Sequence, residues 1–204
     1  MKPSPHHSQT LLLVCVAFFG LALFVGCNED STAPIEDSGN RINPAITPRS
    51  VWESVQVSIN SGERLGWEDA LSPIFSYVPD PVSSSLHPET FDSWGRDSEI
   101  TFISKLFSGD FVLSSQLRAP GFDIPPATGT EVTWNSVEYW VQVEGNGDPY
   151  PTTFAGVANI GFRLEGNFWY IISWTDLSGA AAPWSPGVVL PTLGELRAVM
   201  VELE

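Results

Sequence analysis

The spacing of apolar residues changes near Gly109, and this change limits the possible folds more than any other feature of the chain. Before Gly109, apolar residues recur every three to four positions, as from Val51 to Ile59, which predicts amphipathic helices. After Gly109 they alternate with polar or small neighbours, which predicts strands. Helices that precede a run of antiparallel strands indicate an α+β domain.

Local signals set the expected ends of these elements. Thr47-Pro48 supplies a capping oxygen followed by a first-turn proline, and Gly62 is expected to end the first helix. Two further helices are expected, from residue 67 towards residue 75 and from residue 94 to residue 109. The expected strands include residues 111–117, 130–144, 153–165 and 168–176, the last two joined by a two-residue turn at Gly166-Asn167.

This turn fixes a register in which Leu164 opposes Trp169 and Phe162 opposes Ile171. The more apolar face of each strand should point into the core, which leaves Asp176 and Glu138 facing solvent. The polar groups then expected inside are Asn135, Tyr139 and Ser173. Together with Trp169 they are the candidate ligand-binding residues, although satisfied core polar groups would fit the same pattern.

With no carboxylate or histidine expected on the inner walls of the strands, the sequence predicts no catalytic residue there, because general acid–base catalysis needs a titratable group beside the reacting proton. His87 stands alone in a Ser/Pro-rich loop and is expected at the surface. No metal site or cofactor is expected. An enzymatic alternative would take its acid or base from a helix or from the loop 77–94, where the candidates are Tyr77, Asp92, Asp97 and Glu99, and buried carboxylates with raised pKa values would favour it.

An uncharged apolar run of residues 11–26 leads directly to Cys27. It is short for a membrane-spanning helix and resembles a bacterial lipoprotein signal, in which residues 1–26 are removed and Cys27 is lipidated. Phe24 departs from the usual leucine of such signals, and Cys15 is a poorer acceptor because bulky Val14 precedes it. An uncleaved anchor and a buried helix of the domain are the alternatives. Asn28 after the cysteine favours the outer membrane, with the domain facing the periplasm.

Composition excludes some functions. The formal net charge of −15 repels phosphate backbones, so we expect no nucleic-acid partner, and the membrane link should be the lipid on Cys27 alone. The chain from Cys27 onward has no second cysteine, which excludes disulfides within it. Residues 27–46 are rich in polar residues and proline and predict a flexible acidic tether, whereas residues 47–204 are long and aromatic enough for one domain.

The order of these elements resembles the nuclear-transport-factor-2-like superfamily. The residues that carry the resemblance are the helix from Val51, the Trp94-Gly95-Arg96-Asp97 helix start, the closing pattern of residues 169–176, and residues 192–197, which are similar to the ends of uncharacterised bacterial lipoproteins of that superfamily. The resemblance implies a cone in which N-terminal helices pack in the concave face of a curved antiparallel sheet. It leaves function open, since the superfamily includes isomerases, dehydratases and cyclases as well as non-catalytic binding modules.

The outer face of the expected sheet is unusually aromatic, with Trp134, Trp140, Tyr170 and Trp174 as candidate interface residues. A C-terminal segment from Pro183 that folds back over them is one alternative, but the superfamily resemblance implies a homodimer through this face. Three functions are therefore considered. The first is a lipid-anchored, non-catalytic domain that binds a small apolar ligand or a protein partner. The second is an isomerase- or dehydratase-like enzyme, and the third is a self-associating structural protein of the envelope.

Overall fold

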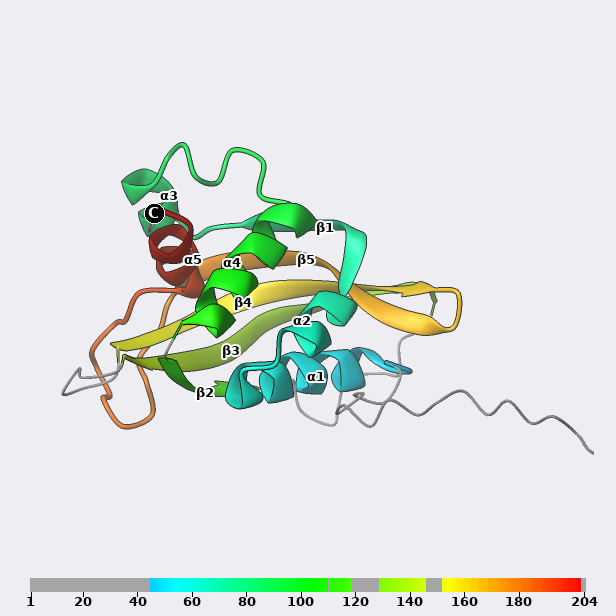
Figure 1. Ribbon diagram of the computed structural model, residues 1–204, viewed down its shortest axis with the longest axis horizontal. Coiled ribbons are helices and arrows are strands. Elements are labelled where there is room, and N and C mark those ends of the chain that lie inside the picture. Colours follow the sequence, from blue (N-terminus) through cyan, green and yellow to red (C-terminus); the bar gives the residue numbers. More distant parts are fainter. Residues whose placement is uncertain (1–44, 110, 119–128, 146–151, 203–204) are drawn as a thin grey trace, which may run out of the picture. The chain divides into compact units, whose positions relative to one another are not determined.

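Figure 1 shows the computed structural model, which describes residues 45–109, 111–118, 129–145 and 152–202. The predicted signal, Cys27 and most of the predicted tether lie outside these residues. The helices are α1 (Pro48–Ser61), α2 (Arg64–Ala70), α3 (Pro81–Leu86), α4 (Arg96–Ser108) and α5 (Leu193–Glu202). The strands are β1 (Leu71–Val78), β2 (Phe111–Leu117), β3 (Glu131–Gly145), β4 (Thr152–Glu165) and β5 (Phe168–Gly179).

The strands form one curved, open sheet in the order β1-β5-β4-β3-β2, and the helices pack against it (Figure 1). Neighbouring strands are antiparallel except β1, which runs parallel to β5 at one edge. The α+β expectation is confirmed, but the expected second helix is too long: β1 begins at Leu71. Pro73 explains this, since a proline inside a helix removes a backbone donor and clashes with the preceding turn.

The start of the first helix is as expected. Thr47 accepts a hydrogen bond from the Ser50 backbone and the Ser50 hydroxyl accepts one from the Thr47 backbone, a reciprocal capping arrangement. Gly62 ends the helix in the left-handed conformation. The helix buries Trp52, whose ring centroid lies 5.1 Å from that of Trp174 and 6.5 Å from that of Trp134. Among the described residues, no helix is long and apolar enough to span a bilayer.

Two interruptions of the sheet decide which side chains enter the cone, by which we mean the interior between the sheet and the helices. The first interruption is in β5. Its Ile171 pairs with Phe162 of β4 and its Ser173 pairs with the neighbouring Gly161, so Ile172 between them is an extra residue without a partner in β4. In β3, Trp134 pairs with Ile160 but Val137 pairs with Ala158, which leaves two residues opposite one. Such bulges reverse the alternation of faces for the rest of the strand.

The bulges overturn part of the expected face assignment. Trp134 and Trp174 are 5% and 1% exposed and lie inside, so the prediction that both belong to an outer interface is wrong. Asp176 is also inside, at 2% exposed. Conversely, Asn135 is exposed and Ser173 is only half-buried, so neither points into the cone as expected. Tyr139 and Trp169 are buried, and their role in ligand binding stays a prediction.

Trp140 and Tyr170 are half-buried on the outer face. The C-terminal segment reaches the first of them: Trp184 packs edge-on against Trp140 with ring centroids 4.9 Å apart. The tail therefore covers part of the predicted interface. A homodimer through the remaining outer face stays a prediction.

Candidate functional site

The cone contains a carboxylate that the strand pattern had placed outside. Asp176 of β5 accepts hydrogen bonds from the Tyr77 hydroxyl at 2.7 Å, the Tyr139 hydroxyl at 2.8 Å and the Trp174 indole at 2.9 Å. These donors come from β1, β3 and β5, so three strands converge on one carboxyl group. Both of its oxygens accept at least one of these bonds.

A second carboxylate lies in the same interior. Glu99 of α4 receives two hydrogen bonds from the Arg197 guanidinium, at 2.8 and 2.9 Å, and one from the Trp94 indole at 2.7 Å. The side chains of Glu99 and Arg197 have no exposed surface. A bidentate Arg–carboxylate pair is among the stronger charged contacts in proteins, and its geometry is strongly directional.

Arg197 connects the two carboxylate sites. Its guanidinium carbon lies 4.0 Å from the centroid of the Tyr77 ring and 4.9 Å from that of Trp174, so two aromatic residues that donate to Asp176 also contact the cation that pairs with Glu99. We call these seven residues the buried polar cluster: Tyr77, Trp94, Glu99, Tyr139, Trp174, Asp176 and Arg197.

The start of α5 lies directly on the two phenols. The Leu193 backbone donates to the Tyr139 hydroxyl at 3.1 Å. Gly194 leaves no room for a larger residue, because a Cβ there would lie 2.7 Å from the Tyr77 hydroxyl and 2.9 Å from Ser83. The chain thus covers its own carboxylates with α5 and fills the space beside them with Arg197.

Burial sets the protonation tendencies of the cluster. Burial raises the pKa of Asp176 above its ordinary value. The positive charge of Arg197 and the three hydrogen-bond donors act to lower this pKa, but the effect of burial is larger. Burial also raises the pKa of Tyr77 and Tyr139 well above 10, and the neighbouring Asp176 adds to both shifts. Burial acts to lower the pKa of Arg197, but the Glu99 carboxylate outweighs it and the net shift is upward. The phenols are therefore hydrogen-bond donors and Arg197 is a fixed cation.

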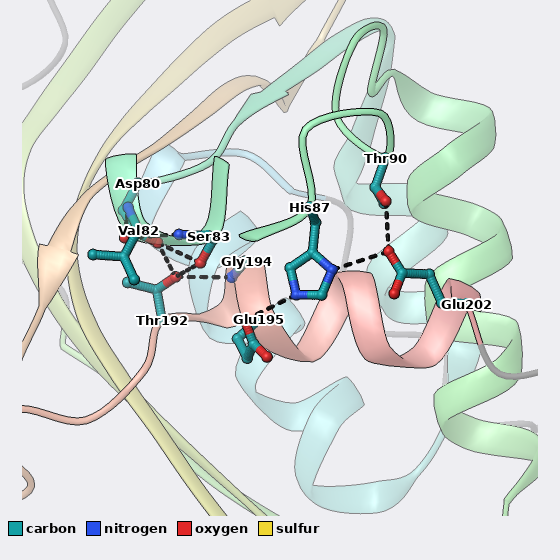
Figure 2. A network of polar contacts seen from close by, with 9 residues as sticks. All are labelled: Asp80, Val82, Ser83, His87, Thr90, Thr192, Gly194, Glu195 and Glu202. Carbon is teal, nitrogen blue, oxygen red and sulfur yellow. Dashed lines mark hydrogen bonds and ion pairs between the residues drawn. The ribbon is translucent and has the colours of Figure 1, made fainter. Parts of the chain in front are cut away.

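Outside the cluster, a second polar network fastens α5 to α3 and the loop that follows (Figure 2). Asp80 caps α3 and accepts a hydrogen bond from Thr192 at 2.6 Å. His87 lies between two carboxylates of α5, with Nε2 3.1 Å from Glu195 and Nδ1 3.0 Å from Glu202. We call this network the α5 clasp: Asp80, Ser83, His87, Thr90, Thr192, Glu195 and Glu202.

The structure separates the residues that the sequence proposed as alternative catalysts. Tyr77 and Glu99 enter the cluster, whereas Asp92 and Asp97 are exposed. Glu138 faces solvent as expected and pairs with Arg118. His87 lies near the surface but is only 16% exposed and is bound on both sides, so it is not the isolated residue that its loop suggested. The described residues contain no group of three side chains suited to a metal ion.

Sequence reasoning missed Asp176 and Arg197. Arg197 did leave a signal, since it is the only basic residue after Arg163 and stands among apolar residues of a helix. A lone arginine on an apolar helix face indicates a buried partner, because a buried charge is costly unless it is paired. Asp176 left no such signal, since its position depends on the bulge at Ile172.

No family model and no curated protein matches the sequence. Solved structures do match. A conserved protein from Planctomyces limnophilus has a TM-score of 0.51 and 11% identity over 63% of this chain and 91% of its own. A structure described as a putative scytalone dehydratase from Novosphingobium aromaticivorans has a TM-score of 0.50 and 9% identity over 70% of this chain and 89% of its own.

A protein of Pseudomonas putida described as NTF2-like and of unknown function matches with a TM-score of 0.44 and 12% identity, over 69% of this chain and 90% of its own. The chain has the fold of the first two structures, which is the nuclear-transport-factor-2-like cone that the sequence resemblance implied. Its helices, curved sheet and strand order agree with the cone that the sequence resemblance implied. At sequence identities this low, a shared fold does not establish a shared activity. The function must therefore be argued from the buried polar cluster.

Proposed function

We propose that this chain is a lipid-anchored, periplasm-facing domain of the bacterial envelope that acts by binding a partner at its surface rather than by catalysis. The observation that supports this is the occupation of the cone by the chain's own Arg197, which pairs with Glu99 while three donors satisfy Asp176. An enzyme of this shape needs its acid or base within about 3 Å of a substrate proton. Here the start of α5 lies on the two phenols that donate to Asp176.

Saturation of the two carboxylates is the physical core of the proposal. Glu99 and Asp176 each accept three hydrogen bonds, and both are at most 2% exposed. Buried carboxylates whose donors all come from the protein stabilise or specify a packed core, whereas catalytic groups keep a free position for substrate. Among the polar atoms of the cluster, only Arg197 Nη1 is buried without a hydrogen-bond partner. We therefore assign the cluster a structural role and place binding on the outside of the domain.

Hydrogen exchange tests the sealed cone. If the cluster is structural, amides of α5 and of the β5 segment around Asp176 will exchange at the same slow rate as those of α1, because all open only on global unfolding. A domain whose cone opens to admit substrate will instead show α5 exchanging much faster than α1, and this result would overturn the proposal.

The anchor is tested separately. Protein isolated from its bacterial host should lack residues 1–26, carry an acyl modification on Cys27 and partition with detergent. Cys27→Ala should abolish acylation, whereas Cys15→Ala should leave it unchanged. Unmodified Cys27 in the isolated protein would rule the anchor out without affecting the argument about the cone.

One observation favours a second candidate, an isomerase- or dehydratase-like enzyme. Asp176 is a buried carboxyl group with a raised pKa beside two phenols, a combination suited to moving a proton if α5 withdrew. The matching structure described as a putative scytalone dehydratase agrees with this candidate. A turnover that Asp176→Asn abolishes and Arg118→Gln preserves would establish it, since Arg118 pairs with exposed Glu138 at the surface.

A further inference from the structure

The segment between β5 and α5 differs in character from the rest of this acidic chain. No charged residue stands between Asp176 and Glu195, which is the longest uncharged stretch between residues 45 and 202. Within it, residues 180–191 connect the two elements, and we call them the uncharged loop. The uncharged loop thus contains no charged residue, although the protein as a whole has a formal net charge of −15.

The uncharged loop exposes large apolar side chains. Trp184 is 51% exposed, Val188 53% and Val189 74%. Every other tryptophan of the chain is buried or half-buried, so Trp184 is the one that faces solvent. Tryptophan favours the boundary between water and lipid, where its ring contacts acyl chains and its indole N–H stays hydrated.

The loop is held in place rather than left free. Both of its ends bond to one residue of β4: the Ala180 N–H donates to the Ala155 carbonyl at 3.0 Å, and the Ala155 N–H donates to the Pro191 carbonyl at 2.8 Å. The Leu190 N–H donates to the Ala180 carbonyl at 2.9 Å, and Trp184 rests against Trp140. The exposed side chains are therefore presented by a fixed loop, which lowers the entropy lost on binding.

We propose that the uncharged loop is a second membrane contact, which inserts Trp184, Val188 and Val189 into the interfacial region of the bilayer that carries the Cys27 lipid. This inference rests on the proposed anchor. Ala45 lies 18 residues after Cys27, and if the residues between them form the flexible tether that the sequence predicts, its root-mean-square span is about 24 Å. A lipidated domain would thus stay close enough to its membrane for a weak apolar contact to be occupied.

Charge indicates which lipids the loop accepts. An anionic surface repels a strongly acidic domain, and the loop offers no basic residue to counter this. Contact should therefore depend on apolar insertion, be strongest on zwitterionic lipid, and change little with salt concentration. This distinguishes it from the electrostatic attachment that basic peripheral proteins use.

The experiment uses the chain from Cys27 to Glu204, coupled through its single thiol to a maleimide lipid in phosphatidylcholine vesicles. Brominated phosphatidylcholines quench nearby tryptophans, and Trp184 is the exposed one. The fluorescence of Trp184 is the part of the emission that is lost in Trp184→Phe. We expect bromines near the headgroup to quench most of this part, and bromines at the ends of the acyl chains to quench less of it. Because coupling is chemical, this result does not depend on whether the host lipidates Cys27.

Variants make the test specific. Val188→Glu together with Val189→Glu should abolish the quenching, whereas Val57→Glu with Leu65→Glu should retain it, since these add the same charges at exposed apolar positions of α1 and α2. Absence of Trp184 quenching in the tethered wild-type chain would overturn the proposal. So would a dimer that the loop variant dissociates in the absence of lipid, because the loop would then bind a second copy.

Discussion

Arg197 and Glu99 lie 98 positions apart in the sequence and form a bidentate ion pair in which neither side chain reaches solvent. One partner belongs to α5 and the other to α4, so the pair joins the last helix to the helix before the main strands. The remaining contacts of Arg197, with Tyr77 and Trp174, extend this connection to β1 and β5.

Removing one partner of this pair should destabilise the domain strongly. Arg197→Met leaves the buried Glu99 carboxyl group without its cation, and breaking a buried pair in this way costs about 3–5 kcal/mol of unfolding free energy. Arg197→Met combined with Glu99→Gln should recover much of that loss, because the amide at position 99 then carries no charge to be compensated. Urea unfolding, monitored by tryptophan fluorescence, measures the unfolding free energy of the single and the double variant. Arg118→Gln is the control, because the Arg118–Glu138 pair is mostly exposed and should contribute less than about 1 kcal/mol.

Asp176 should make stability depend on pH in a defined direction. Its folded-state pKa is raised, so the folded protein holds this proton more tightly than the unfolded chain does. The resulting stabilisation is complete below the ordinary pKa of 3.8 and is lost as pH rises through the raised value. The difference in unfolding free energy between wild type and Asp176→Asn should therefore favour wild type most at acid pH. A difference that does not change with pH would contradict the shift.

His87 should act on stability in a higher pH range. Burial acts to lower its pKa, but hydrogen bonds to Glu202 and Glu195 outweigh this and raise the pKa above 6.5. The charged clasp therefore stabilises the fold fully below pH 6.5, and this contribution disappears as pH rises through the raised value. The melting temperature of wild type should exceed that of His87→Gln by more at about pH 6 than at about pH 9. Equal differences at both would show that His87 is neutral throughout.

Ser136 offers a test of the bulge in β3. It has a φ of 54°, a left-handed conformation that glycine adopts at no steric cost, and its N–H donates to the Asn159 side chain at 3.0 Å. Ser136→Gly should leave the fold unchanged and alter the unfolding free energy by less than about 1 kcal/mol, in the stabilising direction. Ser136→Val, whose branched side chain resists this conformation, should destabilise. If valine is tolerated as well as glycine, the bulge does not require the left-handed residue.

How far the sequence predicts this structure depends on the range of the interactions involved. The start and end of α1 follow from Thr47, Pro48 and Gly62, which act within one turn. Next to the Gly166-Asn167 turn, the expected pairs of Leu164 with Trp169 and Phe162 with Ile171 are confirmed. These features are local, and the residue types that cause them stand at the site where they act.

Within β5, the error begins at Ile172, one residue beyond the last correct pair. Nothing in the composition of β5 marks an inserted residue, because a bulge depends on how the partner strand and the helices beneath it pack. From Ser173 to Asp176 the residues exchange faces, which brings Trp174 and Asp176 into the cone. One extra residue thus places a carboxylate on an inner strand face that was expected to be apolar.

The late position of α5 has a consequence for how this protein comes to be made. Until Arg197 has been synthesised, the nascent domain has no cation for Glu99 and nothing over the Tyr77 and Tyr139 hydroxyls, so the buried polar cluster cannot close. The domain should consequently reach its fully packed state only after α5 has been synthesised. Under the proposed export route, a polypeptide that cannot close this cluster before α5 is complete would remain in the state that export requires.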